Sequence, residues 1–200
     1  GVDESSRHAE RACYFQPPPI AGRKCTSSSG AVGCSNPRPL TALPTATAKH
    51  FDYEVELVVV FGRECRNDSE ADALDYVAGY CTGNDFSARD MQYLTTQFMI
   101  GKTFDGFAPL GPHLVTSDLV GDPNNLRLEC RVNGEQRQDW NTNDMIFNCR
   151  QMISFASRMM TIKPGDVFFT GTPHGVIFGK PKAMALNTAV CFPLLAVGAL

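Results

Sequence analysis

One run of nine residues, from Tyr53 to Phe61, constrains the fold more than any other feature of the chain. It is rich in β-branched, aromatic and other apolar residues, a composition typical of a buried strand. Successive side chains of a strand point to opposite faces, so Glu54 and Glu56 share one face with the apolar Val58 and Val60. The fold must therefore accommodate two neighbouring carboxylates beside apolar surface.

Two like charges held side by side on a buried strand repel each other and are costly to remove from water. A hard divalent cation between them would offset this cost, and carboxylate oxygens suit Mg²⁺ or Mn²⁺. Glu54 and Glu56 are therefore candidate metal ligands. The alternative is a solvated strand end that exposes both glutamates, because this spacing is a weak signal by itself.

Asp85 is the third candidate ligand. It lies in segment 83–90, where an apolar stretch gives way to a polar one, as if a strand ended and a helix began. Arg89 and Gln92 follow four and seven residues later and would share its face if this segment is helical. The alternative is that Asp85 caps the helix N-terminus and pairs with Arg89 along the helix.

Two further features could carry chemistry. Lys102 follows a helix-like segment and precedes a proline-punctuated one, although a lone lysine is more often a surface charge. The turn 170–175 offers backbone N–H groups and hydroxyls, that of Thr172 among them, which could hold a carboxylate. The histidines that lie beside turns, His174 among them, are expected to be structural.

The spacing of apolar residues predicts two longer helices. One begins with a capping-box pattern and covers 69–79, with Val77 on its apolar face. The other is capped by Asn143 or Asp144 and runs to Met160. Its expected apolar face comprises Ile146, Cys149, Ile153, Ala156 and Met160.

The remaining patterned segments predict strands and turns. Residues 126–132 and 135–138 predict a hairpin around the turn Asn133–Gly134, and the turn 164–166 precedes a strand over 167–170. Strands outnumber helices and do not alternate with them regularly. The predicted fold class is therefore mixed α/β, mostly antiparallel β, with helices packed on the outside.

Two hundred residues are enough for one domain with a short appendage. Residues 1–50 are rich in Pro, Ser and Gly, which predicts an irregular segment, either a poorly ordered lead-in or a mobile lid over a site. Residues 51–200 form the predicted metal-binding catalytic domain. The apolar run 189–200 is 12 residues long and contains Pro193. A membrane span needs ~20 residues, so this run predicts a terminal strand.

Net charge limits the kinds of binding partner expected for the protein, and the cysteine content indicates its cellular compartment. A formal net charge of −3 argues against nucleic acid or an anionic membrane as the main partner. The eight cysteines are scattered and form no CxxC motif. They predict free thiols in an intracellular, reducing compartment, either cytoplasmic or mitochondrial. The alternative is a secreted module held by disulfides.

Several segments together resemble the fumarylacetoacetate hydrolase family in order and approximate spacing. They are 51–57, 75–80, 83–92, 101–112, 131–135, 141–147 and 163–173. The resemblance implies a fumarylacetoacetase C-terminal-like β-sandwich or roll and a homodimer. It also implies a bound Mg²⁺ or Mn²⁺ ion with the ligands Glu54, Glu56 and Asp85. The residues it implies around a small oxo-acid substrate are Lys102, near the metal, with Arg89, Gln92 and Thr172.

The family's activities on 2-oxo and 1,3-dicarbonyl acids imply a reaction. The first expectation is hydrolysis of a C–C bond in an acylpyruvate or a fumarylacetoacetate-like acid, with Lys102 stabilising the enolate oxygen. His8, with Glu10, would activate the attacking water. Here Arg11 stands where the family's glutamate falls, and Glu10 is one position early. The alternatives are oxaloacetate decarboxylation or tautomerisation at the same site, which need no attacking water, and a family member without turnover.

Overall fold

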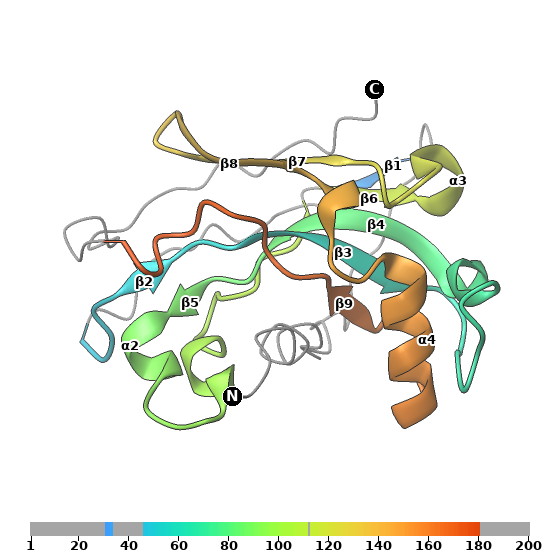
Figure 1. Ribbon diagram of the computed structural model, residues 1–200, viewed down its shortest axis with the longest axis horizontal. Coiled ribbons are helices and arrows are strands. Elements are labelled where there is room, and N and C mark those ends of the chain that lie inside the picture. The colour runs from blue at the N-terminus through green and yellow to red at the C-terminus, as the bar shows by residue number, and fades with distance from the viewer. Residues whose placement is uncertain (1–30, 34–45, 112, 181–200) are drawn as a thin grey trace.

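The structure is a computed structural model that describes residues 31–33, 46–111 and 113–180 (Figure 1). The strands are β1 (Ala31–Gly33), β2 (Phe51–Asp52), β3 (Val55–Phe61), β4 (Val77–Asn84), β5 (Ser87–Ala88), β6 (His113–Thr116), β7 (Arg127–Val132), β8 (Glu135–Asn141) and β9 (Val167–Phe169). The α-helices are α2 (Arg89–Gln92), α3 (Ser117–Val120) and α4 (Cys149–Met159), and the 3₁₀ helices are η1 (Ala73–Tyr76), η2 (Phe98–Gly101) and η3 (Thr142–Asp144). This content confirms the predicted class, mixed α/β and mostly β.

An antiparallel sheet of five strands, in the order β1-β6-β4-β3-β9, forms the centre of the described fold. Its two central strands, β3 and β4, are paired with Val55 opposite Asn84. The same register pairs Glu56 with Gly83, so Asp85 follows immediately where β4 ends. Two segments that lie about 30 residues apart in the sequence thus bring their acidic residues to one end of the sheet.

The hairpin β7–β8 lies over the central strands (Figure 1) and shares a core with them and with α4. Its turn has φ of 52° at Asn133 and 84° at Gly134, as a type I′ turn requires, which confirms the predicted hairpin. The shared core includes Leu57, Val59, Phe61, Leu126, Leu128, Ile153 and Ala156. Each such buried side chain contributes about 1.5–3 kcal/mol relative to an exposed one.

The even-numbered residues of β3 lie on the other face of the sheet. Val58 packs there with Cys81, Val167 and Phe169, so the predicted strand after the turn 164–166 is confirmed as β9. Towards the start of β3 the apolar residues give way to Glu56, as the alternation predicts. A separate buried cluster contains Val55, at the start of β3, and includes the aromatic residues Phe51, Tyr53, Phe86 and Phe107.

The predicted helix over 69–79 is wrong. Only the short η1 forms there, and Val77 already begins β4, opposite Phe61. The turn signal at the start was correct, because the backbone N–H of Asp72 donates to the hydroxyl of Ser69. Pairing of β4 with β3 and β6 places residues 77–79 in the sheet, and this pairing outweighs their helical spacing.

The second helix begins later than predicted. Its N-cap is Asn148, whose side chain and that of Gln151 form a reciprocal capping box, and Asn143 and Asp144 belong instead to η3. Ile146 lies before α4 and is 67% exposed, and Met160 at its C-cap is 40% exposed, so neither joins the buried face. The capping box fixes the start of α4, and the apolar period alone did not reveal it.

Part of segment 1–50, expected to be irregular, forms the strand β1, which pairs with β6. His8, Glu10 and the expected terminal strand over 189–200 lie outside the described residues. Within the described ranges, Cys65, Cys81, Cys130 and Cys149 are buried free thiols. No helix among these residues is long and apolar enough to cross a membrane.

Candidate active site

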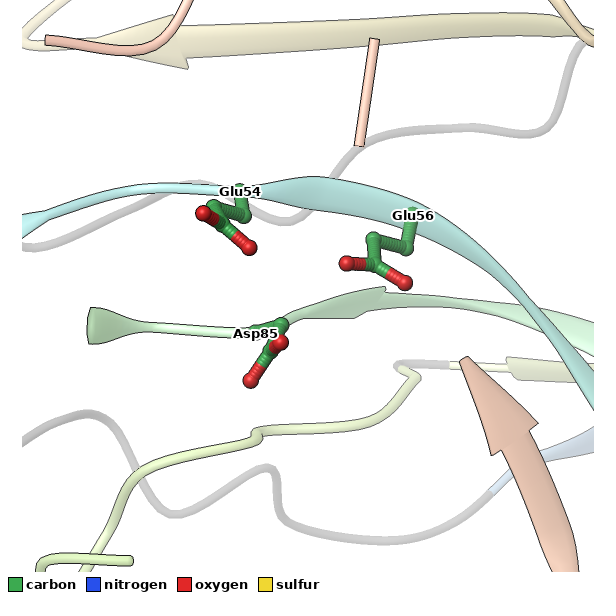
Figure 2. A group of neighbouring side chains, drawn as sticks. All are labelled: Glu54, Glu56 and Asp85. Atoms are coloured by element: carbon green, nitrogen blue, oxygen red, sulfur yellow. The ribbon is translucent and has the colours of Figure 1, made fainter. Parts of the chain in front are cut away.

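Three carboxylates converge at the end of the sheet where β3 begins and β4 ends. One carboxylate oxygen from each of Glu54, Glu56 and Asp85 lies within 4.8 Å of the others (Figure 2). The three residues are 8%, 2% and 7% exposed, so the alternative of a solvated strand end is wrong. The alternative helix-cap role of Asp85 is also wrong, because Ala88 is the N-cap of α2.

Backbone hydrogen bonds fix this arrangement. The N–H of Asp85 donates to the carbonyl of Glu54 at 2.9 Å, and the side-chain oxygen of Asn84 accepts from the N–H of Glu54 at 2.9 Å. The N–H of Gly171, in the turn after β9, donates to Oε2 of Glu56 at 2.7 Å. These bonds hold the backbone of Glu54 and Asp85 and the side chain of Glu56 in place.

Lys102 is buried inside the same cluster. Its Nζ lies 2.9 Å from Oε2 of Glu54 and also donates to Oδ2 of Asp85. The structure therefore places the predicted lysine beside the predicted metal ligands, where its ammonium group supplies positive charge between two of them. A surface position, the ordinary expectation for a lone lysine, is wrong here.

The charges of the cluster do not balance. In the part of the chain that the structure describes, four buried carboxylates, those of Asp52, Glu54, Glu56 and Asp85, face two cations, those of Arg89 and Lys102, which leaves a formal charge of −2. Burial raises the pKa of Asp85 to about 6, and burial together with Asp85 and Glu54 raises the pKa of Glu56 well above its ordinary value. One divalent cation would neutralise this charge, and three carboxylate donors suit Mg²⁺ or Mn²⁺. The residues present fit such an ion.

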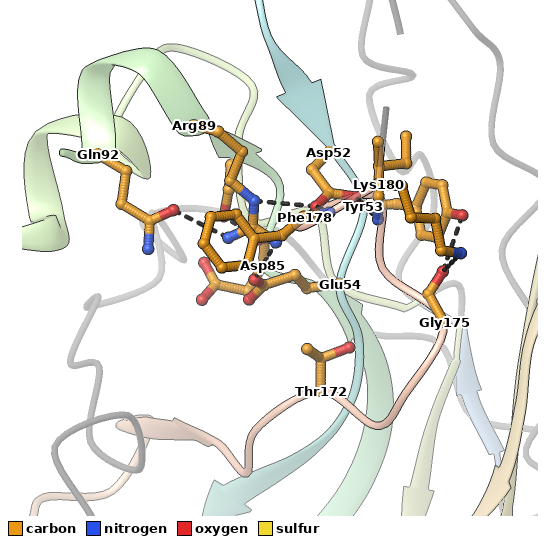
Figure 3. Close-up of polar contacts among 12 residues, drawn as sticks. Asp52, Tyr53, Glu54, Asp85, Arg89, Gln92, Thr172, Gly175, Phe178 and Lys180 are labelled. Atoms are coloured by element: carbon orange, nitrogen blue, oxygen red, sulfur yellow. Dashed lines mark hydrogen bonds and ion pairs between the residues drawn. The ribbon is translucent and has the colours of Figure 1, made fainter. Parts of the chain in front are cut away.

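Arg89, expected to face the substrate, is engaged by protein side chains (Figure 3). Its Nη2 lies 2.6 Å from a carboxylate oxygen of Asp52 and 2.6 Å from Oε1 of Glu54, and its Nη1 donates to the side chain of Gln92 at 2.9 Å. The ring of Phe178 lies over the guanidinium group, 5.3 Å away. These contacts give Arg89 a direct link to a candidate metal ligand.

A pocket of about 440 Å³ opens from the carboxylates. Gln92, Lys102 and Thr172 line it, so three of the predicted residues reach it together with the acidic cluster. Its remaining wall is largely apolar and includes Phe98, Trp140, Met145, Ile146, Phe147 and Val176. His174, expected to be structural, also lines the pocket, and its ring is 6.3 Å from that of Trp140. A small acid could therefore reach a bound cation from this side.

Two buried polar residues that support the site were missed from the sequence. Asp52 accepts hydrogen bonds from Arg89, and Gln138 accepts from the N–H of Val55 and donates to the hydroxyl of Thr172, both at 2.9–3.0 Å. A signal for Gln138 was available. It pairs with the buried Cys130 in the hairpin, at a position where strand alternation expects an apolar side chain.

Comparison with known proteins identifies the family. Residues 7–191 match the family described as Fumarylacetoacetate (FAA) hydrolase C-terminal. The chain belongs to the fumarylacetoacetate hydrolase family. This confirms the resemblance noted in the sequence and, with the solved relatives below, the expected fold.

Three members of the family illustrate its range. The Xenopus laevis protein named oxaloacetate tautomerase fahd2, mitochondrial, is 47% identical over 166 residues, which cover 82% of this chain and 50% of that protein. The structure of a fumarylacetoacetate hydrolase from Exiguobacterium antarcticum is similar at TM-score 0.71 and 38% identity, covering 78% of this chain and 56% of that one. A fumarylpyruvate hydrolase from Pseudomonas aeruginosa, solved with Mn²⁺ and pyruvate, is similar at TM-score 0.62 and 35% identity. The match covers 66% of this chain and 57% of that one. The chain spans about half the length of the curated relatives it matches.

Proposed function

We propose that this chain is part of a divalent-metal-dependent enzyme that interconverts the enol and keto forms of a small 2-oxo acid, with oxaloacetate as the leading substrate. The observation that carries this proposal is the buried trio Glu54, Glu56 and Asp85, which opens into a pocket beside Lys102. The name of the Xenopus laevis relative supports oxaloacetate as the substrate. The Mn²⁺ and pyruvate in the Pseudomonas aeruginosa structure support a metal and a 2-oxo acid in this family's pocket.

The residues of the site suit this chemistry. Glu54, Glu56 and Asp85 would hold the cation, which supplies Lewis-acid polarisation of the 2-oxo group. In the reaction itself, a proton moves between the enol oxygen and the carbon beside the oxo group. Negative charge develops on that oxygen in the transition state, and the ammonium group of Lys102 would stabilise it from a fixed, buried position.

The turn after β9 would orient the substrate. The N–H of Gly171 donates to Glu56, and the hydroxyl of Thr172 accepts from Gln138, so two hydrogen bonds hold the turn beside the pocket. Backbone N–H groups and the Thr172 hydroxyl are suitable donors for a substrate carboxylate. Orientation of this kind lowers the barrier because the reacting groups are already in place.

Hydrolysis of a C–C bond is the second candidate. The names of the Exiguobacterium antarcticum and Pseudomonas aeruginosa relatives favour it. Its expected base is His8, and Arg11 in place of the family's glutamate weighs against hydrolysis. Hydrolysis differs from tautomerisation in one requirement, a base that deprotonates water. His8→Ala therefore separates the two candidates, because it is expected to abolish hydrolysis and to leave tautomerisation unchanged.

The direct test follows the loss of enol absorbance for oxaloacetate and for an acylpyruvate. Each is run with Mg²⁺, with Mn²⁺ and with a chelator, for the natural chain and for Asp85→Asn. The expected result is metal-dependent ketonisation of oxaloacetate that the chelator and Asp85→Asn both abolish. Metal-dependent cleavage of the acylpyruvate alone would establish hydrolysis instead. No turnover with metal bound would establish a family member without catalysis.

Location and assembly complete the proposal. The mitochondrial names of several relatives support a mitochondrial location. A homodimer is supported by large apolar side chains that are exposed near the pocket, among them Trp140, Ile146 and Phe147. Light scattering coupled to gel filtration would test the dimer, and a monomer at micromolar concentration would contradict it.

A further inference from the structure

We infer that Asp52 is a positioning residue for the metal site, which acts through Arg89 on the ligand Glu54. This inference rests on the proposed function. Asp52 is fully buried on β2, and within the described residues its hydrogen bonds and ion pair join it to Arg89, Ile177 and Phe178 rather than to the three carboxylates. Its effect on that cluster would therefore pass through its neighbours.

The first link is the guanidinium group of Arg89. Its Nε and Nη2 donate to the same oxygen of Asp52, Oδ2, at 2.9 and 2.6 Å. The same Nη2 lies 2.6 Å from Oε1 of Glu54. One guanidinium nitrogen is thus shared between a carboxylate outside the acidic trio and a carboxylate inside it.

The second link is the chain segment that follows the substrate turn. The N–H groups of Ile177 and Phe178 donate to the two oxygens of Asp52 at 2.8 and 2.9 Å. The ring of Phe178 then covers the guanidinium group of Arg89. Asp52 therefore accepts four hydrogen bonds from the described residues and joins β2, α2 and the segment after the turn at one buried point.

This arrangement has a consequence for Glu54. Without Asp52, Glu54 would remain as the carboxylate in direct contact with Arg89, and the guanidinium group would compete with a cation for that carboxylate. Asp52 takes up the charge of Arg89 and holds Nη2 on Oε1 in one geometry. Buried partners that orient a metal ligand in this way commonly change metal affinity by about 10–100-fold when they are removed.

The test measures Mn²⁺ affinity by calorimetry on the whole chain after treatment with a chelator. Asp52→Asn keeps the shape of the side chain and removes its charge, and it is expected to weaken Mn²⁺ binding by about tenfold or more. The matched control is Asp90→Asn. Asp90 also accepts backbone N–H groups, those of Lys49 and His50, but these belong to the neighbouring loop. The control is expected to bind Mn²⁺ within twofold of the natural chain.

A double variant separates positioning from a general loss of structure. If Asp52 acts through Arg89, then adding Asp52→Asn to Arg89→Met does not weaken Mn²⁺ binding further. The Mn²⁺ affinities of Arg89→Met and of the double variant then agree within twofold. If Asp52→Asn weakens Mn²⁺ binding as much in the Arg89→Met protein as in the natural chain, the inference is overturned. So would an Asp52→Asn protein with a lowered melting temperature but unchanged Mn²⁺ affinity.

Asp52→Glu is the second variant, for the case in which Asp52→Asn does not fold. It keeps the charge but moves the carboxylate by one methylene, so weaker Mn²⁺ binding is again expected, and unchanged binding would overturn the inference. Failure of the natural chain to bind Mn²⁺ at all would overturn the proposed metal site itself. That outcome is distinct from one in which the natural chain binds Mn²⁺ and only the variants bind it more weakly.

Discussion

The ammonium group of Lys102 lies 2.9 Å from a carboxylate oxygen of Glu54, and both side chains are buried. A third group, the carboxylate of Asp85, accepts from the same ammonium. Lys102 thus partly neutralises the site in which a cation would bind. It both balances the acidic residues and competes for two of them.

Lys102→Met is therefore expected to separate metal binding from catalysis. Loss of the competing charge should leave Mn²⁺ affinity unchanged or increase it, whereas loss of the positive charge beside the developing enolate should lower kcat by about 10²–10³-fold. Calorimetry and steady-state kinetics measure the two effects. Lys163→Met, at an exposed position, is the control. Loss of Mn²⁺ binding in Lys102→Met would contradict this assignment.

Glu56→Gln is expected to remove metal binding without destabilising the metal-free protein. The Gln side chain can still accept from the N–H of Gly171, and it relieves repulsion with Glu54 and Asp85. In the natural chain, Mn²⁺ at 100 times its Kd should add about 2.7 kcal/mol of stability. That corresponds to a rise in Tm of about 5–10 °C.

Thermal unfolding with and without Mn²⁺ measures this difference. The Tm of Glu56→Gln should not rise when Mn²⁺ is added. Its Tm without metal should equal or exceed that of the natural chain. Glu135→Gln, which is exposed on β8, should behave like the natural chain. A strong fall in the metal-free Tm of Glu56→Gln would show that its charge stabilises the fold.

The sequence predicted those parts of the site that local patterns encode. The alternation over residues 53–61 was enough to place Glu54 and Glu56 on one face, because a strand has a fixed period of two. The turn Asn133–Gly134 was predicted for a similar reason, since few residues tolerate positive φ at both positions. The acidic trio additionally depended on the family resemblance, which aligned Asp85 with the two glutamates.

Other parts depend on tertiary partners and could not be predicted locally. Val77 has the spacing of a helical residue with its neighbours, yet it pairs with Phe61 of β3. The choice between helix and strand depends on this pairing, which the local sequence does not show. Asp52 reads as an ordinary acidic residue at a strand end. Its role becomes visible only when Arg89 and Ile177, which lie 37 and 125 residues away, donate to it.

Gln138→Met is expected to weaken substrate binding more than turnover. The Gln138 side chain accepts from Val55 and donates to Thr172 and to the carbonyl of Pro173, so its loss frees the substrate turn. A buried unpaired N–H at Val55 should also cost about 1–3 kcal/mol of stability.

Kinetics and denaturant unfolding check both effects of Gln138→Met. KM should rise several-fold while kcat changes little, and Gln136→Met, at an exposed position on the same strand, should change neither. A fall in kcat at constant KM would argue against a role of the turn in binding.

The buried cysteines are expected to resist alkylation in the folded protein. Burial raises the pKa of Cys65 to about 11 and those of Cys130 and Cys149 to about 12. The thiolate is the reactive form, so at pH 8 these thiols are both protonated and shielded. Mass spectrometry after iodoacetamide should find them modified only in denaturant. Rapid modification without denaturant would show that this core opens readily.

The most direct test of the metal site is a calorimetric titration of the chelator-treated chain with Mn²⁺, alongside Asp85→Asn. If Glu54, Glu56 and Asp85 hold a catalytic cation, the natural chain binds one Mn²⁺ and Asp85→Asn binds none or binds far more weakly. Absence of binding by the natural chain, or equal binding by both proteins, would contradict the assignment of the site.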